Sequence, residues 1–186
     1  MQERNEADAD ASRVQAKCAI ERMLGDIDAL VSTNVIAPDK INQPIARAAI
    51  AYILILLNDC LWLSANVLDY RIDDRGDHVH PTGKERDLTA LIAEARNASC
   101  HVGSPLKNVL SGAVDFIVVV GQDVAVTMTT KTDDGLKTFA AINPYPDDTA
   151  IFWGELRLLI VENLKLAFDR LIAKYSPKMR LHSGIS

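Results

Sequence analysis

Hydrophobic residues recur at spacings of three and four near the start of the chain, which is the period of an amphipathic helix. We therefore predict a helix over 11–32, preceded by a frayed acidic N-terminus over 1–10 and ended by the segment 34–38. The polar residues of this helix should face solvent. The apolar positions that carry the period are Ile20, Leu24, Ile27, Leu30 and Val31.

A second, longer helix is predicted over 39–70, because this segment is apolar on nearly every side. Pro44 suits the first turn of a helix, where its missing N–H costs little, so the start should lie close to Gln43. The most apolar run, 48–57, is much shorter than the roughly 20 residues of a membrane span. We expect a buried helix in the centre of a bundle. Its main apolar residues are Ile45, Ile50, Ile53, Leu54, Leu57 and Leu61.

A polar segment with Gly and Pro over 71–83 predicts a loop, and a third helix follows over 84–102. The loop contains carboxylates and two histidines, which are residue types that can hold zinc or manganese. Because their spacing matches no established metal site, we expect a solvated loop without a metal. The residues concerned are Asp73, Asp74, Asp77, His78 and His80.

The period of the pattern changes to two beyond the third helix, which indicates β-strands. A β-branched run at 116–120, an alternating segment at 124–129 and a further run at 136–142 are separated by turn residues. We expect a strand-rich insertion over 114–142 that forms a small antiparallel hairpin or meander.

Helical spacing of apolar residues returns in the C-terminal part of the chain. Asp147, Asp148 and Thr149 suit the start of a helix, where carboxylates favour the positive end of the helix dipole. We predict a last long helix from 147 that ends before Pro177. The predicted fold class is thus mainly α, an antiparallel helical bundle with a small β insertion before the last helix. The apolar face of that helix would comprise Phe152, Leu156, Leu159, Ile160, Leu164, Phe168 and Leu171.

Composition narrows the class of protein. The 186 residues, 48% hydrophobic and 24% charged, suit one globular domain over 1–186. The net charge of −5 argues against a broad nonspecific nucleic-acid surface, although it is compatible with a small cationic pocket. Cys18, Cys60 and Cys100 lack metal-ligand spacing, which favours reduced thiols in a cytoplasmic protein. The N-terminus lacks the pattern of a signal peptide, and no membrane contact is expected.

Three residues near the end of the third predicted helix form the candidate chemistry: Arg96, Asn97 and His101. With the apolar face at 0°, a step of about 100° per residue places them at roughly 80°, 180° and 220°. His101 therefore points away from the core of its own helix. A histidine exchanges protons near neutral pH, an arginine binds phosphate, and an amide can orient an imidazole or bond to a phosphate oxygen. Together they suit attack by a ribose 2′-hydroxyl on the adjacent phosphate without a metal.

The stretch 95–101, Ala-Arg-Asn-Ala-Ser-Cys-His, resembles the Arg, polar residue, three residues, His signature of HEPN domains. The resemblance implies a helical bundle, typically dimeric, in which two copies of the motif form a composite ribonuclease site without a cofactor. His101 would be the general acid or base, Arg96 would bind the scissile phosphate, and Asn97 would support the geometry. Many HEPN domains belong to toxin–antitoxin or phage-defence systems, so the expected partners are RNA, a second copy and a cognate antitoxin. The strand-rich insertion departs from the simple family pattern.

Two other interpretations fit the same residues. The first is a catalytically inactive HEPN-like binding or regulatory module, which the acidic surface and the added strands favour. The second is a structural helical protein in which Arg96 and Asn97 only solvate a helix face. RNA cleavage separates the first interpretation from a ribonuclease, and the second predicts that mutation of both residues changes no function.

Overall fold

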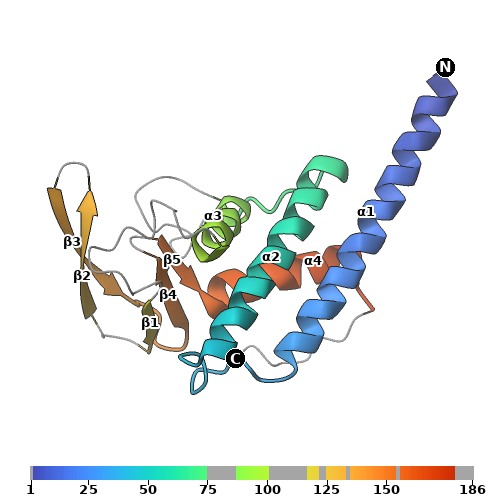
Figure 1. Ribbon diagram of the computed structural model, residues 1–186. Helices are drawn as coiled ribbons and strands as arrows, with labels where there is room; N and C mark the ends of the chain where they lie inside the picture. The colour runs from blue at the N-terminus through green and yellow to red at the C-terminus, as the bar shows by residue number, and fades with distance from the viewer. Residues whose placement is uncertain are drawn as a thin grey trace.

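The computed structural model describes residues 2–74, 87–100, 117–121, 125–132, 135–153 and 156–178. In this part of the chain the fold is mainly helical, with a small three-stranded antiparallel sheet and a separate two-stranded hairpin (Figure 1). The predicted helical class is therefore confirmed. The elements are α1 (Gln2–Val31), α2 (Pro44–Val67), α3 (Leu88–Cys100), β1 (Ile117–Val120), β2 (Ala125–Thr132), β3 (Gly135–Ile142), β4 (Thr149–Trp153), β5 (Leu156–Leu159), the π-helix η3 (Ile160–Lys165) and α4 (Leu166–Tyr175).

Helix α1 ends at Val31, as predicted, but it begins at Gln2 and not near 11. The expected frayed segment over 1–10 is helical from its second residue, because 2–10 contains neither Gly nor Pro and its early acidic residues favour a helix N-terminus. Residues 8–15 are all exposed, and the first turns of α1 extend beyond the neighbouring helices (Figure 1). Where burial is described, from residue 8 onward, the buried residues of α1 begin at Ala16.

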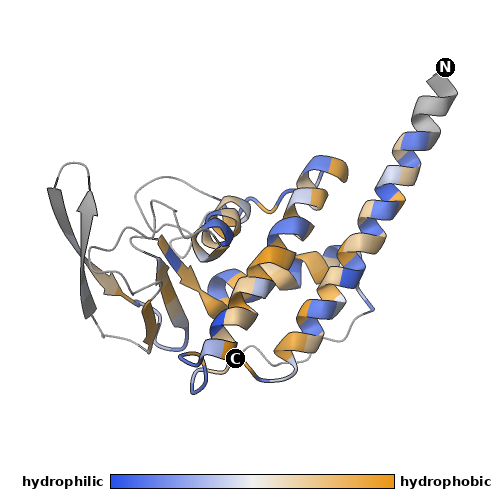
Figure 2. Cartoon of the chain, viewed as in Figure 1, coloured by the Kyte–Doolittle hydropathy of each residue, from blue (hydrophilic) through white to orange (hydrophobic). Residues whose placement is uncertain are grey.

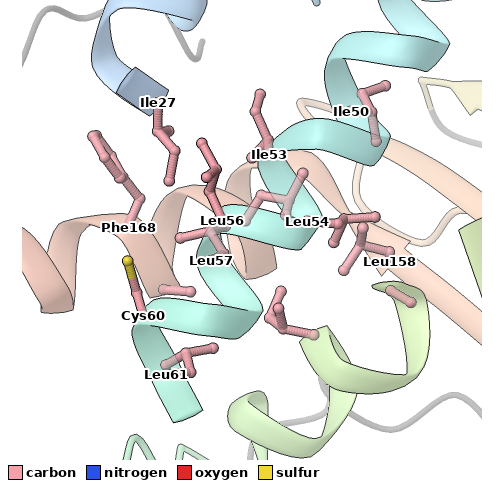
Figure 3. Packing of buried hydrophobic residues seen from close by; sticks show 14 of the residues in the cluster. Ile27, Ile50, Ile53, Leu54, Leu56, Leu57, Cys60, Leu61, Leu158 and Phe168 are labelled. Carbon is pink, nitrogen blue, oxygen red and sulfur yellow. The ribbon is translucent and has the colours of Figure 1, made fainter. Parts of the chain in front are cut away.

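Helix α2 is the central element of the helical part. It begins at Pro44, beside the predicted start, and packs against α1, α3 and α4. Leu57 and Ile53 of α2 belong to one continuous apolar cluster with Ile27 of α1 and Phe168 of α4, which lie next to each other beside α2 (Figure 3). By length and composition α2 could also cross a membrane, although half of its most apolar window is buried inside the protein. A core helix of a soluble protein has the same character.

The predicted hairpin is confirmed, but the predicted meander is not. Strands β2 and β3 pair antiparallel, with Thr129 opposite Thr138. Strand β1 instead pairs with β4, which in turn pairs with β5, so the sheet order is β1-β4-β5. The strand-rich part of the chain therefore extends beyond the predicted limits of 114–142 and reaches Leu159.

The prediction of a helix from 147 is wrong over its first half, which forms β4 and β5. All five residues of β4 are buried, and they alternate between two cores. Ile151 and Trp153 face the main helical core, whereas Ala150 and Phe152 belong to a second, smaller cluster. A strand covered on both faces is continuously apolar, so its sequence lacks the alternation that would distinguish it from a buried helix.

The C-terminal helical segment begins at Ile160 and is capped by Asp148. The Asp148 carboxylate accepts hydrogen bonds from the backbone N–H groups of Val161 and Glu162, both at 2.9 Å. It also accepts one from Thr149 N at 2.6 Å. An acidic cap was predicted at this position, but Asp148 reaches the helix across the β4–β5 pair and not from the adjoining turn. Buried carboxylate oxygens with N–H partners stabilise the N-terminus of a helix.

Candidate functional site

Helix α3 carries the described part of the candidate site and is anchored on its opposite face. Its buried residues pack against α2, β4, β5 and η3. Asn97 is exposed and Arg96 is half-buried, in agreement with their predicted angles relative to the apolar face. Ala98 is fully buried where the prediction had favoured Ser99, which is half-buried. The buried residues of α3 are Leu88, Leu91, Ile92, Ala95 and Ala98.

Arg96 and Asn97 are in direct contact. The Nη1 of Arg96 donates a hydrogen bond to the Oδ1 of Asn97 over 3.0 Å, at an exposed position. The Nε of Arg96 is buried and has no hydrogen-bond partner within the part of the chain that the structure describes. Consequently the guanidinium is held at one end by Asn97, and its other end is enclosed by the protein. The backbone carbonyl of Arg96 accepts a hydrogen bond from Ser99 Oγ at 2.9 Å.

His101, the third predicted site residue, lies outside the described residues, as does Val102 of the predicted apolar face. The structure therefore brings together Arg96 and Asn97 and leaves the position of His101 as a prediction. Cys100, the last residue of α3, is exposed, and its Sγ lies 3.6 Å from Ser99 Oγ. At the described end of α3, the side chains of Asn97 and Cys100 are therefore accessible to solvent.

The loop that was considered as a metal site is described only at its edges. Asp77, His78 and His80 lie outside the described residues. Asp74 accepts a backbone hydrogen bond from Leu88 N at 3.1 Å and lies 3.5 Å from an Arg170 nitrogen. Asp74 is therefore tied to α3 and α4. Within the described ranges no group of three or more His, Cys, Asp or Glu side chains could hold a metal ion.

The start of α3 is fixed by an ion pair that the sequence analysis did not identify. Arg71 Nε and Nη2 donate to the two carboxylate oxygens of Asp87 over 2.7 and 2.8 Å, and Asp87 is buried. The same carboxylate accepts the Ala90 N–H at 2.8 Å, which makes Asp87 the N-cap of α3. Thr89 Oγ1 adds a hydrogen bond to Ile72 O at 2.9 Å. The signal available in the sequence was an aspartate directly before the first apolar residue of the helix, which is the N-cap position.

The three cysteines are free thiols in two different environments. Cys18 and Cys100 are exposed, whereas Cys60 lies in the core beside α4 (Figure 3). Burial, with a smaller contribution from the nearby Asp59 carboxylate, raises the pKa of the Cys60 thiol to about 12. Cys60 is thus a packing residue and not a nucleophile.

Comparison of the chain with family models, curated proteins and solved structures found no match in any of the three. The candidate site therefore depends on the residues of α3 and their geometry. The central observation is an arginine and an asparagine that are hydrogen bonded to each other, on the open side of a helix whose other side is anchored in the core.

Proposed function

We propose that the protein is a metal-independent endoribonuclease of the HEPN type, acting as a cytoplasmic homodimer in a toxin–antitoxin or phage-defence system. The observation that carries this proposal is the contact between Arg96 and Asn97 on the exposed side of α3. A guanidinium in this position can bind a phosphodiester, and the sequence supplies His101 four residues beyond Asn97 for proton transfer. No metal or cofactor is required for this chemistry.

In the proposed reaction the ribose 2′-oxygen attacks the adjacent phosphorus. A bond forms between the 2′-oxygen and phosphorus, and the bond from phosphorus to the 5′-oxygen of the next nucleotide breaks. One His101 takes the 2′-hydroxyl proton, and the protonated His101 of the second copy gives a proton to the leaving 5′-oxygen. Arg96 stabilises the charge on the phosphoryl oxygens. The products are a 2′,3′-cyclic phosphate and a 5′-hydroxyl.

The order of elements supports a HEPN-like bundle as the finer description of the fold. Two long helices, α1 and α2, precede the motif helix α3, and α4 follows it. Helix α2 packs against the other three helices. In this proposal the β-strands between α3 and α4 are an addition to the bundle.

Three exposed large apolar side chains on α2 support the homodimer. Ile45, Tyr52 and Trp62 are exposed by 61%, 48% and 58%, and a step of about 100° per residue spreads them over roughly 100° of the helix surface. The ribbon of α2 is mostly coloured as hydrophobic (Figure 2), and these three side chains are not among the residues of α2 that the core buries. Exposed large apolar side chains are enriched at protein interfaces. A second copy would cover them, and a single histidine per motif makes two copies chemically useful.

RNA cleavage by the wild type and by the variants R96A and H101A tests this proposal. We expect cleavage by the wild type, loss of at least about a hundredfold in rate for R96A and H101A, and normal cleavage by the control variant R22A. Arg22 is an exposed arginine of α1, so R22A controls for the loss of one positive charge. Binding of RNA without cleavage would instead support the inactive binding module.

A further inference from the structure

We propose that Asn97 is a positioning residue: its carbonyl holds the Arg96 guanidinium so that both side chains present only hydrogen-bond donors to a phosphate. This inference deepens the proposed function, because it concerns the same site and its ligand class. It favours one of two roles that the sequence left open for the amide: a part in phosphate recognition and not the orientation of the histidine. Its test does not require RNA turnover.

The hydrogen bond between the two residues has a defined direction. Arg96 Nη1 is the donor and Asn97 Oδ1 is the acceptor, at 3.0 Å. An asparagine side chain has one carbonyl acceptor and one NH₂ donor group. Since the carbonyl faces the guanidinium, the NH₂ group is what Asn97 can offer to a further ligand. A histidine that needed a carbonyl partner would compete with Arg96 for it.

The two ends of the Arg96 guanidinium differ in their accessibility. The Nε of Arg96 is buried, so a ligand reaches this cation through its Nη end. Arginine has a long side chain with many rotamers, and fixing it costs conformational entropy. The hydrogen bond to Asn97 restricts the exposed Nη end before any ligand arrives. Preorganisation of this kind strengthens binding by reducing the entropy lost on association.

The partner of the Arg96 cation is a neutral side chain. Asn97 is neutral, so it orients Arg96 without neutralising it, which an aspartate at this position would do. A fixed cation surrounded by N–H donors matches an oxyanion whose oxygens only accept hydrogen bonds. The ligand class is therefore a phosphate or phosphodiester. The neutral amide at residue 97 is as important for this ligand as the position of the residue.

Titration with inorganic phosphate, followed by the NMR signal of the Arg96 side chain, tests this role in the full-length protein. We expect saturable shifts in the wild type and a Kd about three- to tenfold weaker in N97A, which is the value of one hydrogen bond. N97D keeps the acceptor and adds a negative charge, so we expect phosphate binding to weaken at least tenfold. N58A is the matched control, since Asn58 also bonds to the next residue along its helix, Asp59.

Each outcome decides the proposal separately from the proposed function. Equal phosphate affinities for the wild type, N97A and N97D would overturn the positioning role, even in an active ribonuclease. Weaker binding in N97A and N97D, with N58A unchanged, supports that role even if the wild type cleaves no RNA. Asn97 is exposed, so N97A and N97D should melt at the wild-type temperature, and a melting scan of every variant verifies that each binding change arises in a folded protein.

Discussion

The guanidinium of Arg71 and the carboxylate of Asp87 form a two-point ion pair across the ends of the segment 75–86, and that pair sets where α3 begins. Asp87 also caps α3 through the Ala90 N–H. One carboxylate thus connects the region after α2 with the helix that carries the candidate site. The stability of the site is therefore expected to depend on a contact far from its chemistry.

Replacement of Arg71 by alanine should destabilise the protein by about 2 kcal/mol, because it leaves the buried Asp87 carboxylate without its ionic partner. Urea unfolding measures the change in the free energy of unfolding. The control is R13A, which removes an exposed ion pair with Asp69 and should cost at most about 0.5 kcal/mol. Equal losses in the two variants would show that the Arg71–Asp87 pair is no stronger than a surface pair.

The variant D148N should lower the free energy of unfolding by about 1 to 3 kcal/mol, since both Asp148 oxygens accept backbone N–H groups at the start of η3. D147N provides the matched control, because the neighbouring Asp147 is exposed. Chemical denaturation of both variants measures the difference. A D148N protein as stable as D147N would mean that the capping hydrogen bonds contribute little.

Stability should decrease as the pH rises above 9. The pKa of Cys60 is about 12 in the folded protein, against an ordinary value of 9.0, so the folded state holds this proton more tightly. The contribution is fully present below pH 9 and is lost as the pH rises towards 12, by at most about 1.4 kcal/mol per pH unit. Burial also raises the pKa of Tyr175, which acts in the same direction. Urea unfolding from pH 8 to 11 should show a shallower decline for C60A, and an unchanged slope would contradict this assignment.

Thiol labelling gives a second measurement of the same residue. In the native protein, Cys18 and Cys100 should react quickly with a disulfide reagent, because both are exposed. Cys60 should react only after unfolding. Fast reaction of three thiols in the native state would show that the core around Cys60 opens readily.

The variant W62E should convert a homodimer into a monomer, because it places a charge among the exposed apolar side chains of α2. Light scattering coupled to gel filtration measures the mass of each species. V14E is the control, since Val14 is an equally exposed apolar residue of α1. A monomeric wild type would contradict the proposed dimer. Binding of the wild type, but not W62E, to lipid vesicles would assign these exposed side chains to a membrane instead.

Local patterns along the chain predicted the helical part of the fold well. Pro44 marked the start of α2, and the step of 100° per residue predicted that Asn97 would be exposed. The prediction of a helix failed at β4, because a strand that is buried on both faces lacks the alternation of apolar and polar residues. Phe152 and Leu156 satisfy helical spacing, yet they belong to β4 and β5 of one sheet.

Contacts between distant residues were not predictable in the same way. Asp148 caps a helix thirteen residues away, and that contact exists only because the β4–β5 pair returns the chain. Within the site, the sequence indicated which residues share a face of α3, but the hydrogen bond between Arg96 and Asn97 depends on their rotamers. The residues of the motif were therefore predictable, whereas their interaction was not.

The most direct test of the ribonuclease proposal is cleavage of a mixed RNA pool in the presence of EDTA, by the wild type and by H101A. We expect the wild type to produce 2′,3′-cyclic phosphate ends at the same rate with and without EDTA. We expect H101A, although folded, to cleave at least about a hundredfold more slowly. Equal cleavage by the two proteins, or none by a dimeric wild type across a broad set of RNAs, would contradict the ribonuclease proposal.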